Sequence, residues 1–398
     1  MKNRDIIIVG LQDWDTPIGS NCKNIALEFA RDNRVLYVNY PLDMITFLRE
    51  KSNPNIRKRI DAITSRKAQI REVQKNLWSF YPANLISSIN WIASPSLFNY
   101  LNKRNNRSFA KEIKRAAKML GFSNYILFND NDIFRSFYLK EELQPDMSVY
   151  YIRDYLLSVP YWQKHGARLE PELIQKSDVV VTNSVYLRNY AARYNSNSHY
   201  VGQGCETDLF DPEKQYPVPE ELKSVRKPVV GYIGMLASLR LDIQLLISLA
   251  EKMPDISFVF VGPEDNDFAS SRLHNISNVH FLGSREVSRL PEYVAHFDVC
   301  INPQIVNDVT IGNYPRKVDE YLAMGKPVVA TRTEAMEVFN DHTYLALGAD
   351  DYAEKITRAL QENSEALKKQ RSQFTREHTW ENSVAAIYNA MNIKGGRQ

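Results

Sequence analysis

The sequence predicts an α/β protein with two domains, each built around a doubly wound parallel sheet. Short apolar or β-branched runs alternate with stretches of helical period, which is the pattern of βαβ units. The 398 residues exceed the size at which one hydrophobic core keeps growing. A charged, proline-rich stretch from 211 to 228 lacks periodicity and separates the pattern into two series.

The first series covers the N-terminal half. Its strands are expected at 6–9, 35–38, 125–128, 149–152, 179–182 and 199–201. Its clearer helices are expected at 21–32, 108–120, 171–176 and 185–194. The second series predicts strands at 229–233, 258–261, 279–282, 299–301, 328–330 and 344–346. Its helices are expected at 242–252, 288–296, 317–324, 351–368 and 380–391.

These series divide the chain into a first domain at 1–210, a second at 211–375 and a C-terminal helix at 376–398. We expect the C-terminal helix to pack back toward the first domain. Ligands of open parallel sheets bind beyond the carboxyl ends of the strands. Functional residues are therefore expected in the loops that lead from a strand to the next helix.

The composition is typical of a globular protein and argues against several other classes. Hydrophobic residues make up 44% and charged residues 24%, as in globular proteins. The apolar run before Gly10 is too short for a signal peptide, and Cys22, Cys205 and Cys300 stand far apart, so a cytoplasmic location is expected. A net charge of +3 does not indicate nucleic-acid binding, and the histidines and cysteines lack metal-ligand spacing. No metal and no cofactor are expected.

The most informative segment runs from 313 to 331, with the sequence NYPRKVDEYLAMGKPVVAT. It predicts a loop, a helix and a buried strand, with Asn313 as a helix cap and Gly325 ending the helix. Arg316 and Lys317 at the start of a helix form an anion site, because free backbone N–H groups and cations point the same way. Glu320 follows one turn later. The plainer interpretation is an ordinary helix and strand of a parallel-sheet domain.

This segment resembles the signature N-x-P-x-K-x-x-E-Y-L-A-x-G-K-P-V-V of GT-B glycosyltransferases related to the glycosyltransferase 4 group, also described as glycosyl transferases group 1. The resemblance is to members that build bacterial surface polysaccharides. It extends in order over about 228–392, through PVVGYIGMLASLRLDIQLL, FVFVGPE and NVHFLGSREVSRLPEYVAHFDVCINP. The N-terminal half matches less specifically. The resemblance implies the GT-B fold, in which two Rossmann-like domains face a central cleft.

The resemblance also implies that the second domain binds a nucleotide-diphosphate sugar. The diphosphate is expected near Gly234, Arg240 and Lys317, and the ribose at Glu320. Met235 and Gly312 depart from the family pattern at places where many members carry an arginine and a first acid. The expected donor-binding residues are Gly234, Arg240, Gly283, Ser284, Arg285, Asn313, Lys317 and Glu320.

Breaking an anomeric C–O bond places negative charge on the departing diphosphate, so cations placed in advance lower the barrier. Arg240 and Lys317 are the expected catalytic cations, and the resemblance implies a retaining, metal-independent transfer. Plainer interpretations are a surface ion pair between Arg240 and Asp242 and a solvated helix acid at Glu320.

Residues of the acceptor site are expected after the strands of the first domain. Asp154 is the candidate base or hydroxyl-binding residue, and Asp13, Trp14, Ser20 and Asp132 are the candidate acceptor-binding residues. Acids in solvated loops are equally common. Two other functions remain open: a nucleotide-sugar epimerase of GT-B fold, and a non-catalytic subunit that binds a glycan or a nucleotide sugar.

The segment 76–102 has no charged residue, holds six aromatic residues and lies between two basic stretches. Its prolines exclude a transmembrane helix. Aromatic residues beside Lys and Arg suit contact with the anionic inner face of the cell membrane. A lipid-linked or glycan acceptor would lie there. The plainer interpretation is a strand and loop packed into the first domain, with solvated basic helices around them.

Overall fold

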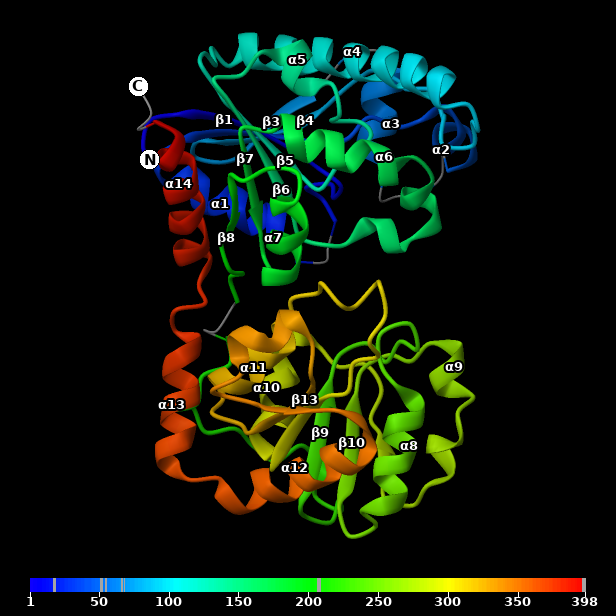
Figure 1. Ribbon diagram of the computed structural model, residues 1–398, viewed down its shortest axis with the longest axis vertical. Helices are drawn as coiled ribbons and strands as arrows, with labels where there is room; N and C mark the ends of the chain where they lie inside the picture. The colour runs from blue at the N-terminus through cyan, green and yellow to red at the C-terminus, as the bar shows by residue number, and fades with distance from the viewer. Residues whose placement is uncertain are drawn as a thin grey trace. The chain divides into compact units, whose positions relative to one another are not determined.

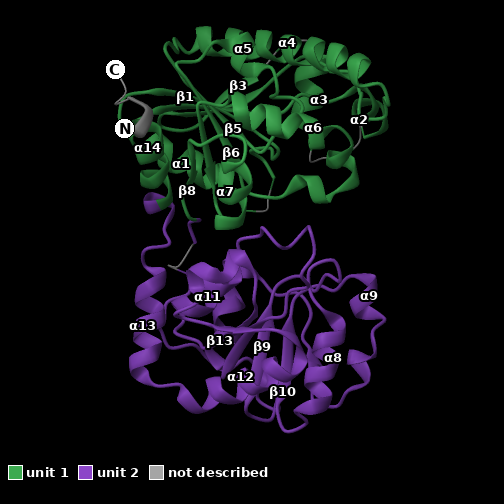
Figure 2. Cartoon of the chain, viewed as in Figure 1, with its two compact units in different colours: residues 1–202, 383–398 green, residues 203–382 purple. Residues whose placement is uncertain are grey.

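The computed structural model describes residues 1–16, 19–50, 53, 56–65, 67, 69–205 and 209–395. The chain forms two compact units, shown in Figure 2. Unit 1 comprises Met1–Gly202 and Ser383–Gln398, and unit 2 comprises Gln203–Asn382. The sequence placed the two crossings between domains at 210 and 375. The fold class is confirmed, because each unit contains a largely parallel sheet between helices.

The sheet of unit 1 has the strand order β3-β4-β2-β1-β5-β6-β7-β8 (Figure 1). All its neighbouring strands are parallel except the edge pair β3 and β4. Neither strand was among the expected strands of the sheet, although the plainer interpretation of 76–102 included a strand. The strands are β1 (Asp5–Gly10), β2 (Arg34–Val38), β3 (Gln69–Gln74), β4 (Leu77–Tyr81), β5 (Ile126–Asp130), β6 (Met147–Ile152), β7 (Val179–Thr182) and β8 (Ser198–Tyr200).

Two helices of unit 1 are longer than their sequence patterns indicated, while α1 has the expected bounds and α7 ends two residues earlier than expected. The expected helices at 108–120 and 171–176 are only the C-terminal parts of α4 and α6. Helix α4 begins at Pro95 because Ser94 caps it, accepting a hydrogen bond from the Leu97 N–H. The helices are α1 (Asn21–Asp32), α2 (Met44–Arg49), α3 (Arg57–Thr64), α4 (Pro95–Met119), α5 (Leu139–Leu143), α6 (Pro160–Lys176) and α7 (Val185–Ala192), and α14 (Trp380–Gly395) ends the chain.

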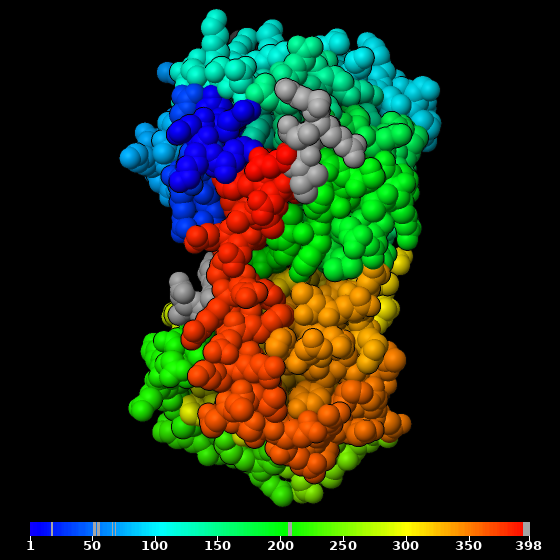
Figure 3. All heavy atoms as spheres, turned by 60° about the vertical axis from the view of Figure 1, so that its left-hand side comes forward, coloured from blue at the N-terminus to red at the C-terminus, as the bar shows by residue number. Residues whose placement is uncertain are grey.

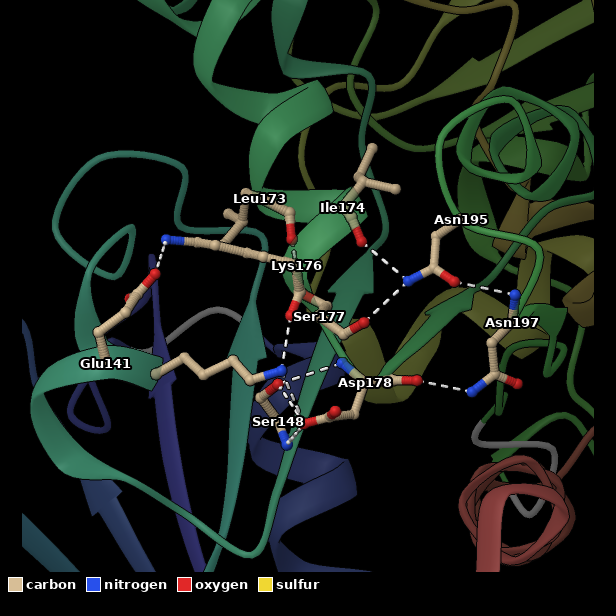
Figure 4. Close-up of polar contacts among 10 residues, drawn as sticks. Glu141, Ser148, Leu173, Ile174, Lys176, Ser177, Asp178, Asn195 and Asn197 are labelled. Atoms are coloured by element: carbon tan, nitrogen blue, oxygen red, sulfur yellow. Dashed lines mark hydrogen bonds and ion pairs between the residues drawn. The ribbon is translucent and has the colours of Figure 1, made fainter. Parts of the chain in front are cut away.

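Hydrogen bonds close the amino ends of β6, β7 and β8, as Figure 4 shows. The Asp178 carboxylate accepts from both the backbone N–H and the hydroxyl of Ser148. The Asn195 side chain donates to the carbonyls of Ile174 and Ser177, and that of Asn197 donates to the Asp178 carbonyl. The polar residues at this edge of the sheet are therefore structural. A ligand site is expected at the carboxyl edge instead.

Unit 2 contains a six-stranded, fully parallel sheet in the order β11-β10-β9-β12-β13-β14. Its four central strands are buried on both faces, as expected for a parallel sheet covered by helices on both sides, and the edge strand β11 is partly buried. The strands are β9 (Val229–Ile233), β10 (Ser257–Val261), β11 (Val279–Phe281), β12 (Val299–Asn302), β13 (Val328–Thr331) and β14 (Tyr344–Ala346).

One helix expected in unit 2 is divided into two helices in the structure. The pattern at 351–368 predicted a continuous helix, but it ends at Glu362 and a new one begins after Ser364, whose hydroxyl caps the Leu367 N–H. The helices are α8 (Ile243–Lys252), α9 (Asn266–Ala269), α10 (Leu290–His296), α11 (Arg316–Ala323), α12 (Gly348–Glu362) and α13 (Glu365–Thr375).

Candidate functional site

A pocket of about 220 Å³ in unit 2 lies at the amino end of α11, beside the loops that follow β9 and β12. Among the described residues, three cations line it, Arg240, Arg316 and Lys317, and no carboxylate residue does. The lining residues are Tyr232, Arg240, Leu241, Asn302, Gln304, Thr310, Asn313, Tyr314, Pro315, Arg316 and Lys317. An acid-free pocket with three cations is suited to a ligand that carries two or more negative charges.

Gly234 and Lys317 lie against each other at this pocket. Gly234 has a φ of +122°, and a Cβ there would overlap the Lys317 side chain and lie 2.8 Å from its Nζ. Lys317 Nζ also lies 5.4 Å from the centre of the Tyr232 ring. The missing side chain of Gly234 is therefore what allows the Lys317 ammonium to lie at the end of β9.

Arg240 is held by its backbone and has a free side chain. Its N–H donates to the Ala237 carbonyl, and its own carbonyl accepts from the Ile305 N–H, both at 2.9 Å. Within the described residues Arg240 forms no ion pair, and Asp242 instead caps α8 by accepting from the Leu245 N–H. The surface pair between Arg240 and Asp242 is therefore absent.

The start of α11 differs from the expectation in one respect. The N-cap residue is Pro315, whose side chain makes no capping hydrogen bond, so Asn313 is not the N-cap and the prediction of that cap was wrong. Asn313 instead lines the pocket, with its N–H donating to the Thr310 carbonyl at 3.0 Å. As a lining residue, Asn313 is in reach of a ligand in the pocket.

Two buried contacts fix the position of α11. The Tyr321 hydroxyl accepts a hydrogen bond from the Ile233 N–H at 2.9 Å, which ties the helix to the end of β9. The fully buried Asp319 lies 2.6 Å from His378 Nδ1. Burial raises the pKa of Asp319, and His378 opposes that rise. Lys317 therefore projects from a helix that is anchored on both sides.

The remaining predicted donor residues lie outside the lining of this pocket. Glu320 is on the next turn of α11, with 17% of its side chain exposed and its Oε1 4.0 Å from Arg316 Nη2. Gly283, Ser284 and Arg285 follow β11. Arg285 is held by the Tyr293 hydroxyl at 2.8 Å and by Glu221 at 2.7 Å.

Among the pocket residues that the sequence did not predict are Asn302, Gln304 and Thr310. Asn302 ends β12, Gln304 and Thr310 follow it, and the Gln304 amide donates to the Thr310 carbonyl at 2.8 Å. The signal that could have revealed them is the change from the apolar run VCI to polar residues at the carboxyl end of a strand.

A larger cavity, of about 820 Å³, lies at the opposite end of the same helix, where Met324 and Gly325 line it. Its lining includes the carboxylates Glu213 and Glu365 as well as the cations Lys214, Lys326, Lys368, Lys369 and Arg376. The carboxyl end of a helix carries partial negative charge, which disfavours an anion there. The smaller pocket at the amino end is therefore the better candidate for an anionic ligand.

In unit 1, buried polar atoms without a hydrogen-bond partner gather at the carboxyl ends of β1 and β5. Buried polar groups in proteins are usually hydrogen-bonded, so this group of atoms in the described part of the chain is a candidate for contact with a polar ligand. Those in this region are Gln12 Oε1, Asp13 Oδ1, Ser20 Oγ, Asn24 Nδ2, Arg59 Nη1, Asp130 Oδ2 and Asn131 Nδ2. Their concentration contrasts with the satisfied amino edge of the same sheet.

Asp13 and Arg59 form a buried ion pair in this region, with Asp13 Oδ2 and Arg59 Nη2 2.6 Å apart. Burial raises the pKa of Asp13 to about 6, although Arg59 and Arg135 oppose the rise. Arg59 and Arg135 also lie over the Tyr40 ring, at 4.3 and 4.1 Å from its centre. Arg59 was not predicted from the sequence, because it belongs to a basic stretch that resembles a solvated face.

The other predicted acceptor residues differ in accessibility. Trp14 stacks edge-on against Tyr37, with ring centres 5.2 Å apart, and Ser20 precedes α1 with its hydroxyl unpartnered. Asp132 is fully buried, pairs with Arg135 at 2.9 Å and accepts from backbone N–H groups. In this structure the Asp132 carboxylate thus holds Arg135 in place.

Asp154 is the most accessible of the predicted acids, with 40% of its side chain exposed. Its Oδ2 lies 2.8 Å from Arg153 Nη1, and Arg153 in turn pairs with the fully buried Asp130 at 3.0 Å. The Asn131 side chain accepts from the Asp154 N–H at 3.0 Å. This network fixes Asp154 at the carboxyl end of β6 and leaves it in reach of a ligand.

Within the described residues, no group of three or more His, Cys, Asp or Glu side chains is placed to hold a metal ion.

Comparisons with known proteins agree with this geometry. Residues 227–362 match the family described as glycosyl transferases group 1. A protein of Bacillus subtilis named for teichuronic acid biosynthesis, the glycosyltransferase TuaH, is 28% identical over 222 residues. That match spans 53% of this chain and 56% of the relative's length.

Solved structures share the fold over nearly the whole chain. Sucrose-phosphate synthase from Thermosynechococcus elongatus is 16% identical, with a TM-score of 0.66 and full coverage of both chains. HepE from Anabaena, solved with UDP, is 15% identical, with a TM-score of 0.65 and coverage of 98% of this chain and 100% of that one. HepE has also been solved with UDP-glucose. At this identity the likeness shows the fold.

Proposed function

We propose that this chain, which has the GT-B fold and matches the group 1 glycosyltransferases over residues 227–362, moves a sugar from a nucleotide-diphosphate donor, held by unit 2, to an acceptor held by unit 1. The observation that carries the proposal is the acid-free pocket lined by Arg240, Arg316 and Lys317. The donor's diphosphate supplies the negative charges that this pocket would neutralise.

The two predicted cations act on the leaving group. As the anomeric C–O bond breaks, its electron pair leaves with the diphosphate oxygen, and Arg240 and Lys317 stabilise that charge more in the transition state than in the bound donor. The acceptor hydroxyl oxygen forms the new bond to the anomeric carbon, and its proton passes to the leaving phosphate oxygen. In this scheme the configuration at the sugar is retained and no metal takes part.

The rest of the donor binds around the diphosphate. Glu320, one turn beyond Lys317, accepts hydrogen bonds from the ribose hydroxyls. Gly283 and Ser284 border the base at the end of β11, while Arg285 holds their loop through Tyr293 and Glu221. Asn313 supplies an amide to the phosphates or to the sugar.

On the acceptor side, Asp154 binds and orients the attacking hydroxyl. The support for this role is its exposure together with its fixed position beside Arg153. Asp13, Trp14 and Ser20 bind the acceptor at the end of β1, where unpartnered polar atoms gather. Asp132 contributes by holding Arg135.

The biological setting is the assembly of a cell-envelope polysaccharide or glycolipid, on a glycan or lipid-linked acceptor at the inner face of the membrane. The similarity to TuaH, which is named for teichuronic acid biosynthesis, supports this setting. The solved complexes of HepE with UDP and UDP-glucose make uridine nucleotides the first donors to test.

The test is incubation with UDP-, GDP-, ADP- and TDP-linked sugars, followed by measurement of nucleotide diphosphate and sugar. A transferase releases the diphosphate slowly, and faster when an acceptor is added. Lys317→Ala should weaken binding of the preferred diphosphate at least about tenfold, since a charged hydrogen bond contributes about 1.5–3 kcal/mol.

The matched control is Lys369→Ala, which removes a cation from the larger cavity and should leave diphosphate affinity unchanged. A changed sugar without diphosphate release would indicate an epimerase instead. Binding of donor with neither product would indicate a non-catalytic subunit, and absence of binding to every nucleotide would reject the donor site.

A further inference from the structure

The outer face of α4 carries a row of cations. Seven Lys or Arg residues lie along the exposed face of this helix, which forms one edge of unit 1 in Figure 1. They are Lys103, Arg104, Arg107, Lys111, Lys114, Arg115 and Lys118. The one acid of the helix, Glu112, is buried on its inner side. The spacing of three and four residues places all seven on one face.

Most of these cations are not neutralised by the protein. Among the described residues, ion pairs join Arg107 to Glu142 and Arg115 to Glu112. Lys103 lies 5.9 Å from the centre of an aromatic ring, that of Tyr138. The remaining four, Arg104, Lys111, Lys114 and Lys118, pair with no carboxylate in the described part of the chain.

Large apolar side chains are exposed at the amino end of the same face. Leu97 and Tyr100 are 49% and 68% exposed, and Trp91, just before the helix, is 73% exposed. Trp91 is held in place, because its Nε1 donates to the Ser88 carbonyl at 2.8 Å and its carbonyl accepts from Lys164 Nζ at 2.9 Å. These hydrogen bonds therefore hold Trp91 in an exposed position.

Helix α2 adds to this apolar region. It has no buried residue, and Met44, Ile45 and Leu48 are 47%, 42% and 61% exposed. Its first turn is hydrogen-bonded to the segment before Trp91, from the Met44 N–H to the Ile86 carbonyl at 3.1 Å and from the Ile45 N–H to the Ser88 hydroxyl at 3.3 Å.

We propose that this surface, made of the exposed face of α4, Trp91 and α2, docks on an anionic lipid bilayer. Aromatic and aliphatic side chains partition into the interface between headgroups and acyl chains, and the cations beside them attract anionic headgroups. Helix α4 has 25 residues and is about 37 Å long. In the proposed contact the helix lies parallel to the membrane, so that its row of cations faces the headgroups.

A soluble polyanion explains fewer of the observations. It would use the cations of α4 but would leave Trp91, Tyr100 and Leu48 in water, at a cost in apolar exposure. A bilayer accounts for both kinds of residue. The contact would be peripheral, since no helix in the described residues is long and apolar enough to cross a membrane.

The proposal is tested by sedimentation of the full chain with vesicles of phosphatidylglycerol and phosphatidylcholine in equal parts, and with vesicles of phosphatidylcholine alone. Binding should require the anionic lipid and should weaken sharply at about 0.5 M salt. Arg104→Gln with Lys111→Gln should lower the partition coefficient about 25-fold, or about five-fold per cation. Trp91→Ser with Tyr100→Ser should lower it at least about tenfold.

Two matched controls make the same chemical changes in unit 2. Lys223→Gln with Lys369→Gln removes the same charge, and Leu347→Ser with Val218→Ser removes exposed apolar residues. Both controls should bind vesicles as the unaltered chain does. Thermal unfolding of each variant establishes that it is folded.

The proposal is overturned if the unaltered chain ignores both kinds of vesicle, if the α4 variants bind normally, or if the controls lose as much binding. Competition by soluble polyglutamate, together with unchanged vesicle binding by the Trp91 and Tyr100 variant, would point to a polyanion and also overturn it. The assay needs no donor or acceptor, so its outcome is independent of the proposed glycosyl transfer.

Discussion

Gly234 has the conformation and the surroundings that only glycine tolerates. Its φ of +122° disfavours any residue with a Cβ, and the space that a Cβ would fill is occupied by the Lys317 side chain. Gly262 approaches from β10, and a Cβ there would overlap the Gly234 carbonyl. The position of a predicted catalytic cation thus depends on a neighbouring glycine.

We expect Gly234→Ala to destabilise unit 2 by about 1–3 kcal/mol through backbone strain, and also to displace Lys317 and weaken nucleotide-diphosphate binding about tenfold. Gly348→Ala is the control, because its φ of +73° brings similar strain but nothing lies within 4 Å of its Cβ. The control should lose stability without losing affinity. Denaturant unfolding and calorimetric titration measure the two quantities, and equal affinities for both variants would contradict the role of Gly234.

Among single residues, those inside a sequence motif could be predicted. Residues that folding brings to the site from other parts of the chain could not. Arg240, Asn313 and Lys317 were named from the sequence and line one pocket. Thr310 was missed because a polar loop residue carries no signal by itself. Arg59 was missed because its burial depends on folding against the end of β1, which its basic neighbours do not reveal.

The same limit appears among secondary-structure elements. Strand β3 has only two apolar residues, Ile70 and Val73, which do not alternate with polar ones, and it lies largely exposed at an edge, so it lacks the apolar signal of a strand. Strand β4 lies inside the uncharged segment, whose plainer interpretation was a packed strand and loop. Phe80 and Tyr81 in β4 are indeed buried, while Trp91 and Tyr100 from the same segment are exposed. Composition alone could not separate these two groups.

Helix α6 is joined to β6 and α7 by a buried acid. Glu170 is 1% exposed and accepts hydrogen bonds from the Tyr150 hydroxyl at 2.9 Å and the Tyr190 hydroxyl at 3.1 Å. Burial raises the pKa of Glu170 from 4.5 to about 7, against the effect of both hydroxyls. The folded chain therefore holds this proton over a range in which the unfolded chain releases it.

Because the folded state binds the extra proton, the contribution of Glu170 to stability is full below pH 4.5 and is lost as the pH rises through about 7. We expect the unaltered chain to lose on the order of 3 kcal/mol across this range relative to Glu170→Gln, which stays neutral. Denaturant unfolding at a series of pH values measures the difference.

Glu172→Gln, on the same helix with half of its side chain exposed, is the control and should follow the unaltered chain. A Glu170→Gln profile parallel to that of the unaltered chain would show that the pKa of Glu170 is not raised.

At the scale of the whole molecule, each unit has its own sheet and core, and the chain passes between them twice. The predicted donor residues all belong to unit 2, and the predicted acceptor residues all belong to unit 1. The two series of βαβ units in the sequence made this division predictable, because each sheet is assembled from strands that are consecutive along the chain. A donor that binds only unit 2 should therefore stabilise that unit first.

We expect the preferred nucleotide diphosphate, at about 100 times its dissociation constant, to slow hydrogen exchange of the slowest amides in unit 2 about 100-fold, since it binds only the folded unit. The slowest amides in β5 and β6 of unit 1 should exchange at an unchanged rate. Mass spectrometry of exchanged peptides measures both units in one sample. Lys317→Ala, which removes the pocket's central cation, should abolish the protection in unit 2. Equal slowing of both units would mean that they unfold together, and no slowing in either would remove the donor from unit 2.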